Sequence, residues 1–170
     1  GEAERRARGT PRHFELRGQV ELEAGGERFT LVGRADRVDE APDGRLLIYD
    51  YKSGKPPTAK QQAAFDKQLL LLAAMAERGA CGATGARGVA GAAFVGLGAE
   101  AKVVPAPLDD HPPAQVWEEL RAVLALWTSP ARGYTARLAA EATDRVGDHD
   151  HLARFGEWDL SDDPVPEDLA

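Results

Sequence analysis

Two aspartates and one lysine are candidates for a catalytic site, because of their side-chain types and their spacing in the sequence. Asp50 and Lys52 lie two positions apart in the stretch IYDYKSGK, so a strand would place both side chains on one face. Asp36 is a second acid, and two carboxylates brought together repel each other unless a cation lies between them. Mg²⁺ suits such a pair, because it takes one or two protein carboxylates and leaves room for a substrate phosphate. With a lysine to stabilise negative charge, the grouping suits phosphodiester hydrolysis.

A simpler alternative is a structural ion pair between Lys52 and one of the aspartates at a sheet edge. An Asp-x-Lys pattern on a strand is common and usually consists of exposed surface residues without a function. The second acid, the apolar positions around the pattern and the helix expected directly after it favour the catalytic interpretation.

A β-hairpin would bring the two aspartates together. Residues 28–38 and 45–52 are predicted strands, and the sequence PDG at 42–44 suits a three-residue hairpin loop. Proline fixes the first loop position, and glycine accepts the left-handed backbone of the last. In the register that this loop imposes, Asp36 lies opposite Asp50, and directly opposed residues share a face.

The rest of the chain continues with strands and helices. We expect further strands at 13–23, 89–97 and 102–104 and helices at 59–77 and 113–128. In the strand at 13–23, alternation gives an apolar side of Phe14, Leu16, Val20 and Leu22. Strands, a helix, strands and a helix in this order predict an α/β fold, a mixed sheet flanked by α-helices.

Length and charge divide the chain into two parts. The 170 residues suit one domain and carry a net charge of −7, but residues 131–170 alone hold four arginines and ten acids. We therefore expect a core at 1–130 and an acidic C-terminal extension at 131–170. Because the core is close to neutral, charge neither supports nor excludes DNA as a partner.

Composition also limits location and cofactors. No apolar run approaches the roughly 20 residues that span a bilayer, so we expect no membrane partner. Cys81 is the only cysteine, which excludes an internal disulfide and a four-cysteine metal site and is compatible with the cytoplasm. The first residue is not Met and the chain opens in what reads as a helix, so we expect a piece of a longer polypeptide.

Three segments resemble the PD-(D/E)XK nuclease superfamily, and within it the RecB-like nucleases. They are GRADRVD at 33–39, GRLLIYDYKSG at 44–54 and KQLLLL at 67–72. The C-terminal segment 134–159 narrows the resemblance to the nuclease domains of the AddB family. Leu72 departs from the pattern, because many relatives carry a tyrosine four residues after the glutamine.

The resemblance implies a restriction-endonuclease-like fold and a role for each residue. Asp36 and Asp50 become metal ligands for Mg²⁺ or Mn²⁺, Lys52 becomes the catalytic lysine, and Gln68 supports the site or contacts DNA. Some AddB proteins hold an iron–sulfur cluster through four cysteines. With Cys81 alone, we expect no cluster in this chain.

An upstream acid or histidine near the metal is also common in the family. Glu15 and His13 are the candidates, and Glu15 is preferred as a third metal ligand, although a solvated strand face explains either residue. Asp39 lies an odd number of positions from Asp36, so alternation sends it to the other face. There it would be structural, paired with Arg37 or Arg34.

The resulting expectation is a Mg²⁺-dependent deoxyribonuclease, an exonuclease domain of an AddAB-type helicase–nuclease that acts in double-strand break repair and recombination. Its partners would be DNA and an AddA-type subunit. One alternative is a non-catalytic module that only docks to DNA or a partner. Another is a stand-alone RecB-like exonuclease.

Overall fold

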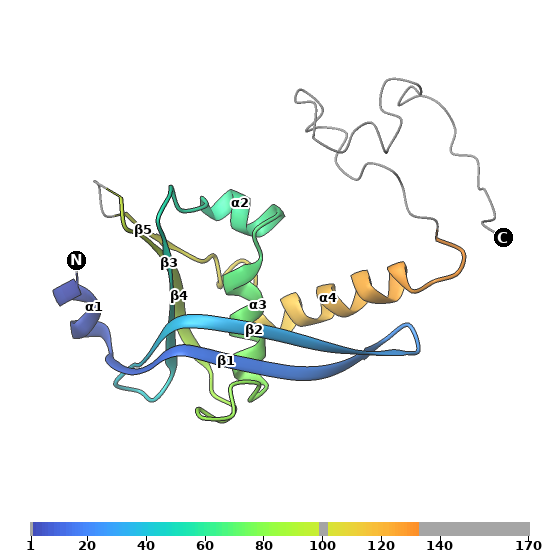
Figure 1. The fold of residues 1–170 in the computed structure, drawn as a ribbon, viewed down its shortest axis with the longest axis horizontal. Helices are drawn as coiled ribbons and strands as arrows, with labels where there is room; N and C mark the ends of the chain where they lie inside the picture. The colour runs from blue at the N-terminus through green and yellow to red at the C-terminus, as the bar shows by residue number, and fades with distance from the viewer. Residues whose placement is uncertain (1, 99–101, 133–170) are drawn as a thin grey trace, which may run out of the picture. The chain divides into compact units, whose positions relative to one another are not determined.

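The structure, a computed structural model, describes residues 2–98 and 102–132 (Figure 1). Internal contacts separate the chain into two units, Gly1–Thr128 and Ser129–Ala170. The expected C-terminal extension and the segment at 134–159 lie outside the described residues, apart from the first residues of the extension. The first unit contains these elements: α1 Glu2–Arg8, β1 Thr10–Ala24, β2 Glu27–Glu40, β3 Leu46–Lys52, α2 Ala59–Ala64, α3 Gln68–Glu77, β4 Val89–Gly96, β5 Val103–Pro105 and α4 Pro113–Trp127.

One mixed sheet organises the first unit, with the strand order β1-β2-β3-β4-β5. All neighbours are antiparallel except β3 and β4, which are parallel and are joined by the crossover through α2 and α3. A crossover with helices is what parallel neighbours require. The predicted α/β class is confirmed, and the predicted strands differ from the observed ones by one to three residues at their ends.

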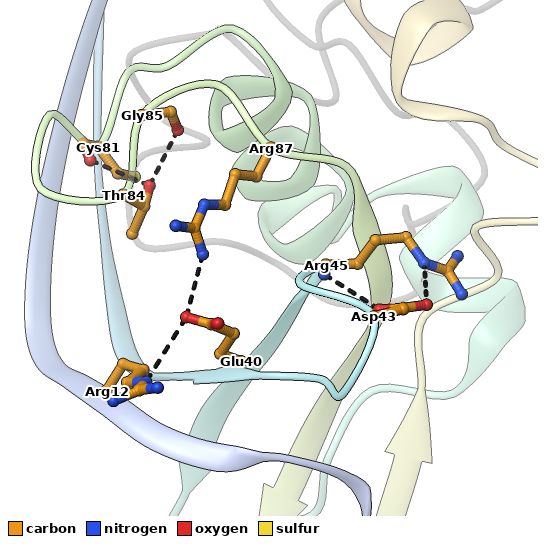
Figure 2. Close-up of polar contacts among 8 residues, drawn as sticks. All are labelled: Arg12, Glu40, Asp43, Arg45, Cys81, Thr84, Gly85 and Arg87. Carbon is orange, nitrogen blue, oxygen red and sulfur yellow. Dashed lines mark hydrogen bonds and ion pairs between the residues drawn. The ribbon is translucent and has the colours of Figure 1, made fainter.

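The β2–β3 hairpin has the predicted three-residue loop. Ala41 N–H donates to Arg45 O at 2.8 Å, and Gly44 has φ +82°, the left-handed conformation that glycine adopts without strain. Asp43 accepts bonds from the main-chain N–H of Arg45 at 3.0 Å and from its Nε at 2.8 Å (Figure 2). Local turn chemistry therefore sets the register of the two strands.

A glutamate at the same end of the sheet joins three segments. Glu40 Oε2 lies 3.5 Å from Arg12 Nε on β1 and 3.0 Å from Arg87 Nη1, just before β4 (Figure 2). In the connection that leads to Arg87, Thr84 Oγ1 lies 3.1 Å from the carbonyl of Cys81, to which it can donate. These contacts fasten the glycine-rich connection between α3 and β4 to the hairpin.

Helix α3 is apolar almost all round because it is covered on two sides, as buried helices are. One side packs on the sheet and the other on α4, which runs alongside the β1–β2 hairpin (Figure 1). The first contact buries side chains from three strands and the helix, including Val38, Ile48, Leu69, Ala73 and Phe94. The second buries Leu22, Leu70, Ala74, Val116 and Trp117. None of the described helices is long and apolar enough to cross a membrane.

The expected single helix at 59–77 is wrong, because it is interrupted at residues 65–67. The N–H groups of Phe65 and Asp66 both donate to Gln61 O, which ends α2. Gln62 is fully buried, and its amide nitrogen lies 3.3 Å from Pro105 O on β5. A contact with a residue distant in the sequence therefore fixes α2 on the sheet edge, while α3 follows its own buried path.

The expected inward position of Phe14 is also wrong, because its side chain is 66% exposed. Alternation along β1 is broken on both sides of this residue. The register with β2 shifts between Pro11 and His13, and Glu15 has φ +52°. Leu22, beyond the irregularity, is buried as expected.

Candidate active site

Asp36 lies where β2 separates from β3. The paired residues of the two strands end at Arg37 and Tyr49, in the predicted register; continued by one step, this register would set Asp36 opposite Asp50. Beyond this point a side chain of β2 replaces the main chain as hydrogen-bond partner of β3: Asp36 Oδ2 accepts the main-chain N–H of Tyr51 at 2.8 Å. The carboxylate of Asp36 is thereby held at the backbone of Tyr51, the residue that follows Asp50.

Asp50, Lys52 and Gln68 meet in one cluster. Lys52 Nζ lies 2.9 Å from Asp50 Oδ2 and donates to Gln68 Oε1 at 2.9 Å. Gln68 Nε2 in turn donates to Asp50 Oδ1 at 2.6 Å. The cluster joins β3 to the first residue of α3, so the end of the strand and the start of the helix define the site together.

One oxygen of Asp50 has the Lys52 ammonium beside it but accepts no hydrogen bond from any residue that the structure describes. The side chain of Asp50 is only 6% exposed, and its Oδ2 has no hydrogen-bond donor among the described residues. The approach of Lys52 Nζ lacks hydrogen-bond geometry, so charge attraction alone holds the pair at this oxygen. A buried carboxylate oxygen without a donor is unfavourable unless a cation or water lies beside it, and here the Lys52 ammonium is that cation.

The donor set fits a hard divalent cation. Asp36 and Asp50 offer carboxylate oxygens, and Mg²⁺ typically binds through one or two carboxylates together with waters and substrate phosphate. Among the described residues there is no group of three or more His, Cys, Asp or Glu side chains that could hold a metal. The part of the chain that the structure describes thus offers a pair of carboxylates for a cation.

Apolar surroundings strengthen the electrostatic interactions of this site. Lys52 Nζ lies 4.9 Å from the centroid of the Phe94 ring, which is itself fully buried. A cation over a ring face is attracted to it, and a low local dielectric strengthens the interaction with Asp50. The lysine side chain is still 32% exposed, so its ammonium can meet a ligand from solvent.

The start of α3 is fixed from the side of α4. Lys67, the residue before Gln68, donates from Nζ to Glu119 Oε2 at 3.1 Å. Gln115 Nε2 donates to Glu119 Oε1 at 2.8 Å, and this bond, followed by the one from Lys67, lowers the pKa of Glu119. The glutamine that reaches Asp50 therefore begins a helix whose first turn is tied to another element.

The reverse side of the hairpin carries a buried ion pair. Arg37 donates from Nε and Nη2 to the two oxygens of Asp39 at 2.7 and 2.6 Å, with side chains 5% and 0% exposed. Asp39 therefore pairs with Arg37, as alternation suggests. Burial, followed by the charge of Asp39, raises the pKa of Tyr49. Arg37 Nη1 also lies 3.4 Å from the hydroxyl of Tyr51, the residue whose N–H holds Asp36.

Glu15, the preferred upstream candidate, forms its ion pair with Arg34 and not with the cluster. The pairs on either side of Glu15 place it opposite Asp36, but its carboxylate is 61% exposed and lies 2.7 Å from Arg34 Nη1. His13 pairs with Val38. Glu15 as a third metal ligand stays a prediction. Tyr51 was not predicted as part of the site, because its side-chain type is irrelevant there: it donates its main-chain N–H to Asp36.

Two hollows of the first unit differ in their relation to the cluster. A groove of about 220 Å³ runs between β2 and α3 and reaches Gln68, with Gly33, Leu71 and Leu72 among its lining residues. A larger hollow of about 480 Å³ is lined by Tyr49 and Gly91 and does not include Asp36, Asp50, Lys52 or Gln68. The smaller groove is therefore the one connected to the candidate site.

The chain belongs to the PD-(D/E)XK nuclease superfamily, because the model of that family matches residues 1–150. The matched range contains the strands that carry Asp36, Asp50 and Lys52 and the helix that begins at Gln68. The mixed sheet flanked by helices is accordingly a restriction-endonuclease-like fold.

The similar curated proteins carry the name uncharacterised protein. A protein of Rickettsia typhi is 35% identical over 49 residues, which is 29% of this chain and 6% of that protein. A protein of Rickettsia bellii is 32% identical over 60 residues, or 35% of this chain and 7% of that protein. The matches thus span a small part of these relatives. Among solved structures, the crystal structure of SSO0001 is similar to this chain with a TM-score of 0.39 and 14% sequence identity. The match covers 65% of this chain and 49% of the SSO0001 chain.

Proposed function

We propose that this chain is a divalent-metal-dependent deoxyribonuclease domain that hydrolyses phosphodiester bonds of DNA. The observation that carries the proposal is the cluster of Asp50, Lys52 and Gln68 beside Asp36, at the joint between β2, β3 and α3. Membership of a nuclease superfamily supports it. Mg²⁺ or Mn²⁺, held by Asp36 and Asp50, would polarise a phosphoryl oxygen and acidify a bound water.

The protein residues have separate tasks in this proposal. Asp36 and Asp50 bind the cation, each oriented by a hydrogen bond through one oxygen. The ammonium of Lys52 lies 2.9 Å from Asp50 and stabilises the negative charge that develops on the phosphate. Gln68 holds the acid and the ammonium at a fixed separation, so that less reorganisation is needed during the reaction.

The finer assignment follows from the sequence resemblance. We propose that the domain works as the AddB-type part of an AddAB helicase–nuclease in double-strand break repair, beside an AddA-type subunit and in the cytoplasm. Exonuclease action is part of this proposal. A docking module without catalysis remains the second candidate, since Leu72 replaces the tyrosine of many relatives and lines the groove that reaches Gln68.

The test is cleavage of linear DNA by the 170-residue chain with Mg²⁺ or Mn²⁺, compared with Asp50→Asn. The substitution keeps the shape of the side chain but removes its charge, so the cation is held less tightly. We expect the variant to lose at least 100-fold in cleavage rate, a loss of the size found for key electrostatic groups. Asp43→Asn, in the exposed hairpin loop, is the matched control and should cleave like wild type.

Equal cleavage by wild type and Asp50→Asn would disprove the assigned site. Titration with Mn²⁺ gives a second, independent reading. Binding should disappear in Asp36→Ala and Asp50→Ala and persist in Glu15→Ala if Glu15 is not a ligand. Metal binding without any cleavage, alone or in a helicase–nuclease complex, would favour the docking module.

A further inference from the structure

An aromatic side chain next to the candidate site has no structural explanation within the unit. Phe65 is 80% exposed, the highest value among the large apolar side chains that the structure describes. It follows α2 directly and precedes Gln68 by three residues, which span at most about 11 Å of chain. An exposed aromatic this close along the chain to Gln68, which contacts both Asp50 and Lys52, is suited to contact the substrate.

The segment that presents Phe65 is firmly placed. Thr58 and Gln61 form a reciprocal capping box at the start of α2. The buried amide of Gln62 lies 3.3 Å from Pro57 O and from Pro105 O, which joins the helix to β5. Lys67 ties the other side of the interruption to α4. The ring therefore extends from a fixed support and not from a loose loop.

The same segment is basic within an acidic chain. Between Tyr51 and Phe65 the sequence has three lysines and no acid, although the whole chain carries −7. Lys55 and Lys60 are exposed, and the structure gives neither an ion-pair partner among the described residues. Lys52, the third lysine, belongs to the cluster with Asp50. Positive charge thus continues from the candidate site along the segment to the aromatic ring.

We propose that residues 53–65 bind unpaired DNA that enters the site, with Lys55 and Lys60 near phosphates and Phe65 stacked on a base; the inference rests on the proposed function. Grooves for single strands combine positive charge along the backbone with aromatic rings that stack on bases. Stacking needs a free base face, and bases inside a duplex have none to offer. The preferred substrate is therefore a single strand or a frayed end, with little dependence on sequence.

The experiment measures binding of fluorescein-labelled oligothymidine to the 170-residue chain in EDTA, where DNA stays intact. We expect Phe65→Ala to weaken single-strand binding about ten-fold, within the range for loss of one stacked base, and Phe65→Trp to keep it. Phe14→Ala removes another exposed phenylalanine, 66% exposed on β1, and should change nothing. Lys55→Ala and Lys60→Ala should each lower the salt dependence by about 0.7 in the log–log slope.

A fluorescent base analogue, quenched when stacked, gives the second reading. Quenching by wild type and Phe65→Trp but not by Phe65→Ala supports the proposal, as does weaker binding of a blunt duplex. Equal binding by Phe65→Ala and Phe14→Ala overturns it and leaves the ring to a protein partner. Binding through Phe65 without metal-dependent cleavage would retain this inference and reject the nuclease proposal. If Phe65→Ala cleaves and binds single strands as wild type does, the nuclease proposal is retained and this inference is rejected.

Discussion

Gln68 and Asp50 are joined by a hydrogen bond of 2.6 Å from Nε2 to Oδ1, across the joint between α3 and β3. The other half of the same amide, Oε1, accepts from Lys52 Nζ at 2.9 Å. A glutamine can do both, because its planar end carries a donor and an acceptor. One side chain from the helix thereby fixes the acid and the ammonium of the strand relative to each other.

Gln68→Ala should lower cleavage about 10- to 100-fold while metal still binds, because groups that orient metal ligands typically contribute that much. Gln68→Glu should fail as well, since an ionised carboxylate accepts from Lys52 but cannot donate to Asp50. The measurement is the initial rate on linear DNA at several Mn²⁺ concentrations. Gln19→Ala, an exposed glutamine on β1, is the control. Wild-type rates in both variants of Gln68 would contradict an orienting role.

Lys52→Met separates the charge of the lysine from its packing. The methionine keeps an aliphatic stem near Phe94 but loses the ammonium, so cleavage should fall about 100- to 1,000-fold. Mn²⁺ binding should persist, because the ligands Asp36 and Asp50 remain. Rates and calorimetric titration check the two expectations separately. Lys102→Met, at an exposed position outside the cluster, should behave like wild type. Loss of metal binding in Lys52→Met would mean that the lysine mainly holds Asp50 in place.

The β2–β3 hairpin was predictable because its determinants are local. The sequence PDG at 42–44 favours one loop length, and the loop fixes which residues of the two strands face each other. The observed pairs up to Arg37 and Tyr49 match the predicted register, and the pairing of Asp36 with Asp50 beyond them stays a prediction. The pair of Arg37 and Asp39 followed in the same way, from alternation along a single strand. Wherever two neighbouring strands and a tight turn were sufficient, the sequence indicated the correct arrangement.

The helix interruption was not predictable, because its cause is tertiary. Residues 59–77 contain no glycine or proline, and their Ala, Gln, Lys and Leu residues all favour one continuous helix. The interruption depends on Gln62 reaching Pro105 O and on Lys67 reaching Glu119, both distant in the sequence. The irregularity around Glu15 is of the same kind, since alternation assumes an undisturbed strand. For this reason the exposed position of Phe65 became visible only in the structure.

Arg37→Ala should destabilise the fold by about 3–5 kcal/mol, because it leaves Asp39 charged, buried and unpaired. Arg45→Ala is the matched control, since it removes the arginine of another Arg–Asp pair two residues apart, here with both side chains more than half exposed. Its cost should be about 0–1 kcal/mol. Urea unfolding of both variants measures the difference. Similar losses in the two variants would show that burial does not set the strength of the Arg37 pair.

Gly18→Ala should destabilise the fold by about 1–3 kcal/mol through overpacking. A Cβ at this position would lie 2.8 Å from Cys81 Sγ, and the connection that carries Cys81 has little room to move, because the N–H of Gln19 donates to Ala80 O at 2.9 Å. Removing the sulfur in Cys81→Ala should recover most of the loss in the double variant. Gly54→Ala, with nothing within 4 Å of its new Cβ, is the control. Thermal unfolding of wild type, Gly18→Ala, Cys81→Ala and the double variant would show whether the two positions are coupled. If the stability losses of the two single variants simply add in the double variant, the contact is excluded.

Glu119 should make stability depend on pH in the acid range. Hydrogen bonds from Gln115 and then Lys67 lower the pKa of Glu119 in the folded chain below its ordinary value of 4.5. The charged form is therefore favoured by folding: its contribution is complete above pH 4.5 and is lost as the pH falls through the folded pKa. The pair with Lys67 is near the surface, so the contribution should be at most about 1 kcal/mol.

Urea unfolding of wild type and Glu119→Gln from neutral to acid pH tests this. The difference between the two proteins should be constant above pH 4.5 and should vanish only when the pH has fallen through the lowered pKa of folded Glu119. Added salt should reduce the difference, because exposed charges are screened. Lys67→Met should also lower cleavage, because Lys67 precedes Gln68 and its bond to Glu119 fixes the start of α3. A stability difference that is the same at every pH would show that Glu119 acts through packing and not through its charge.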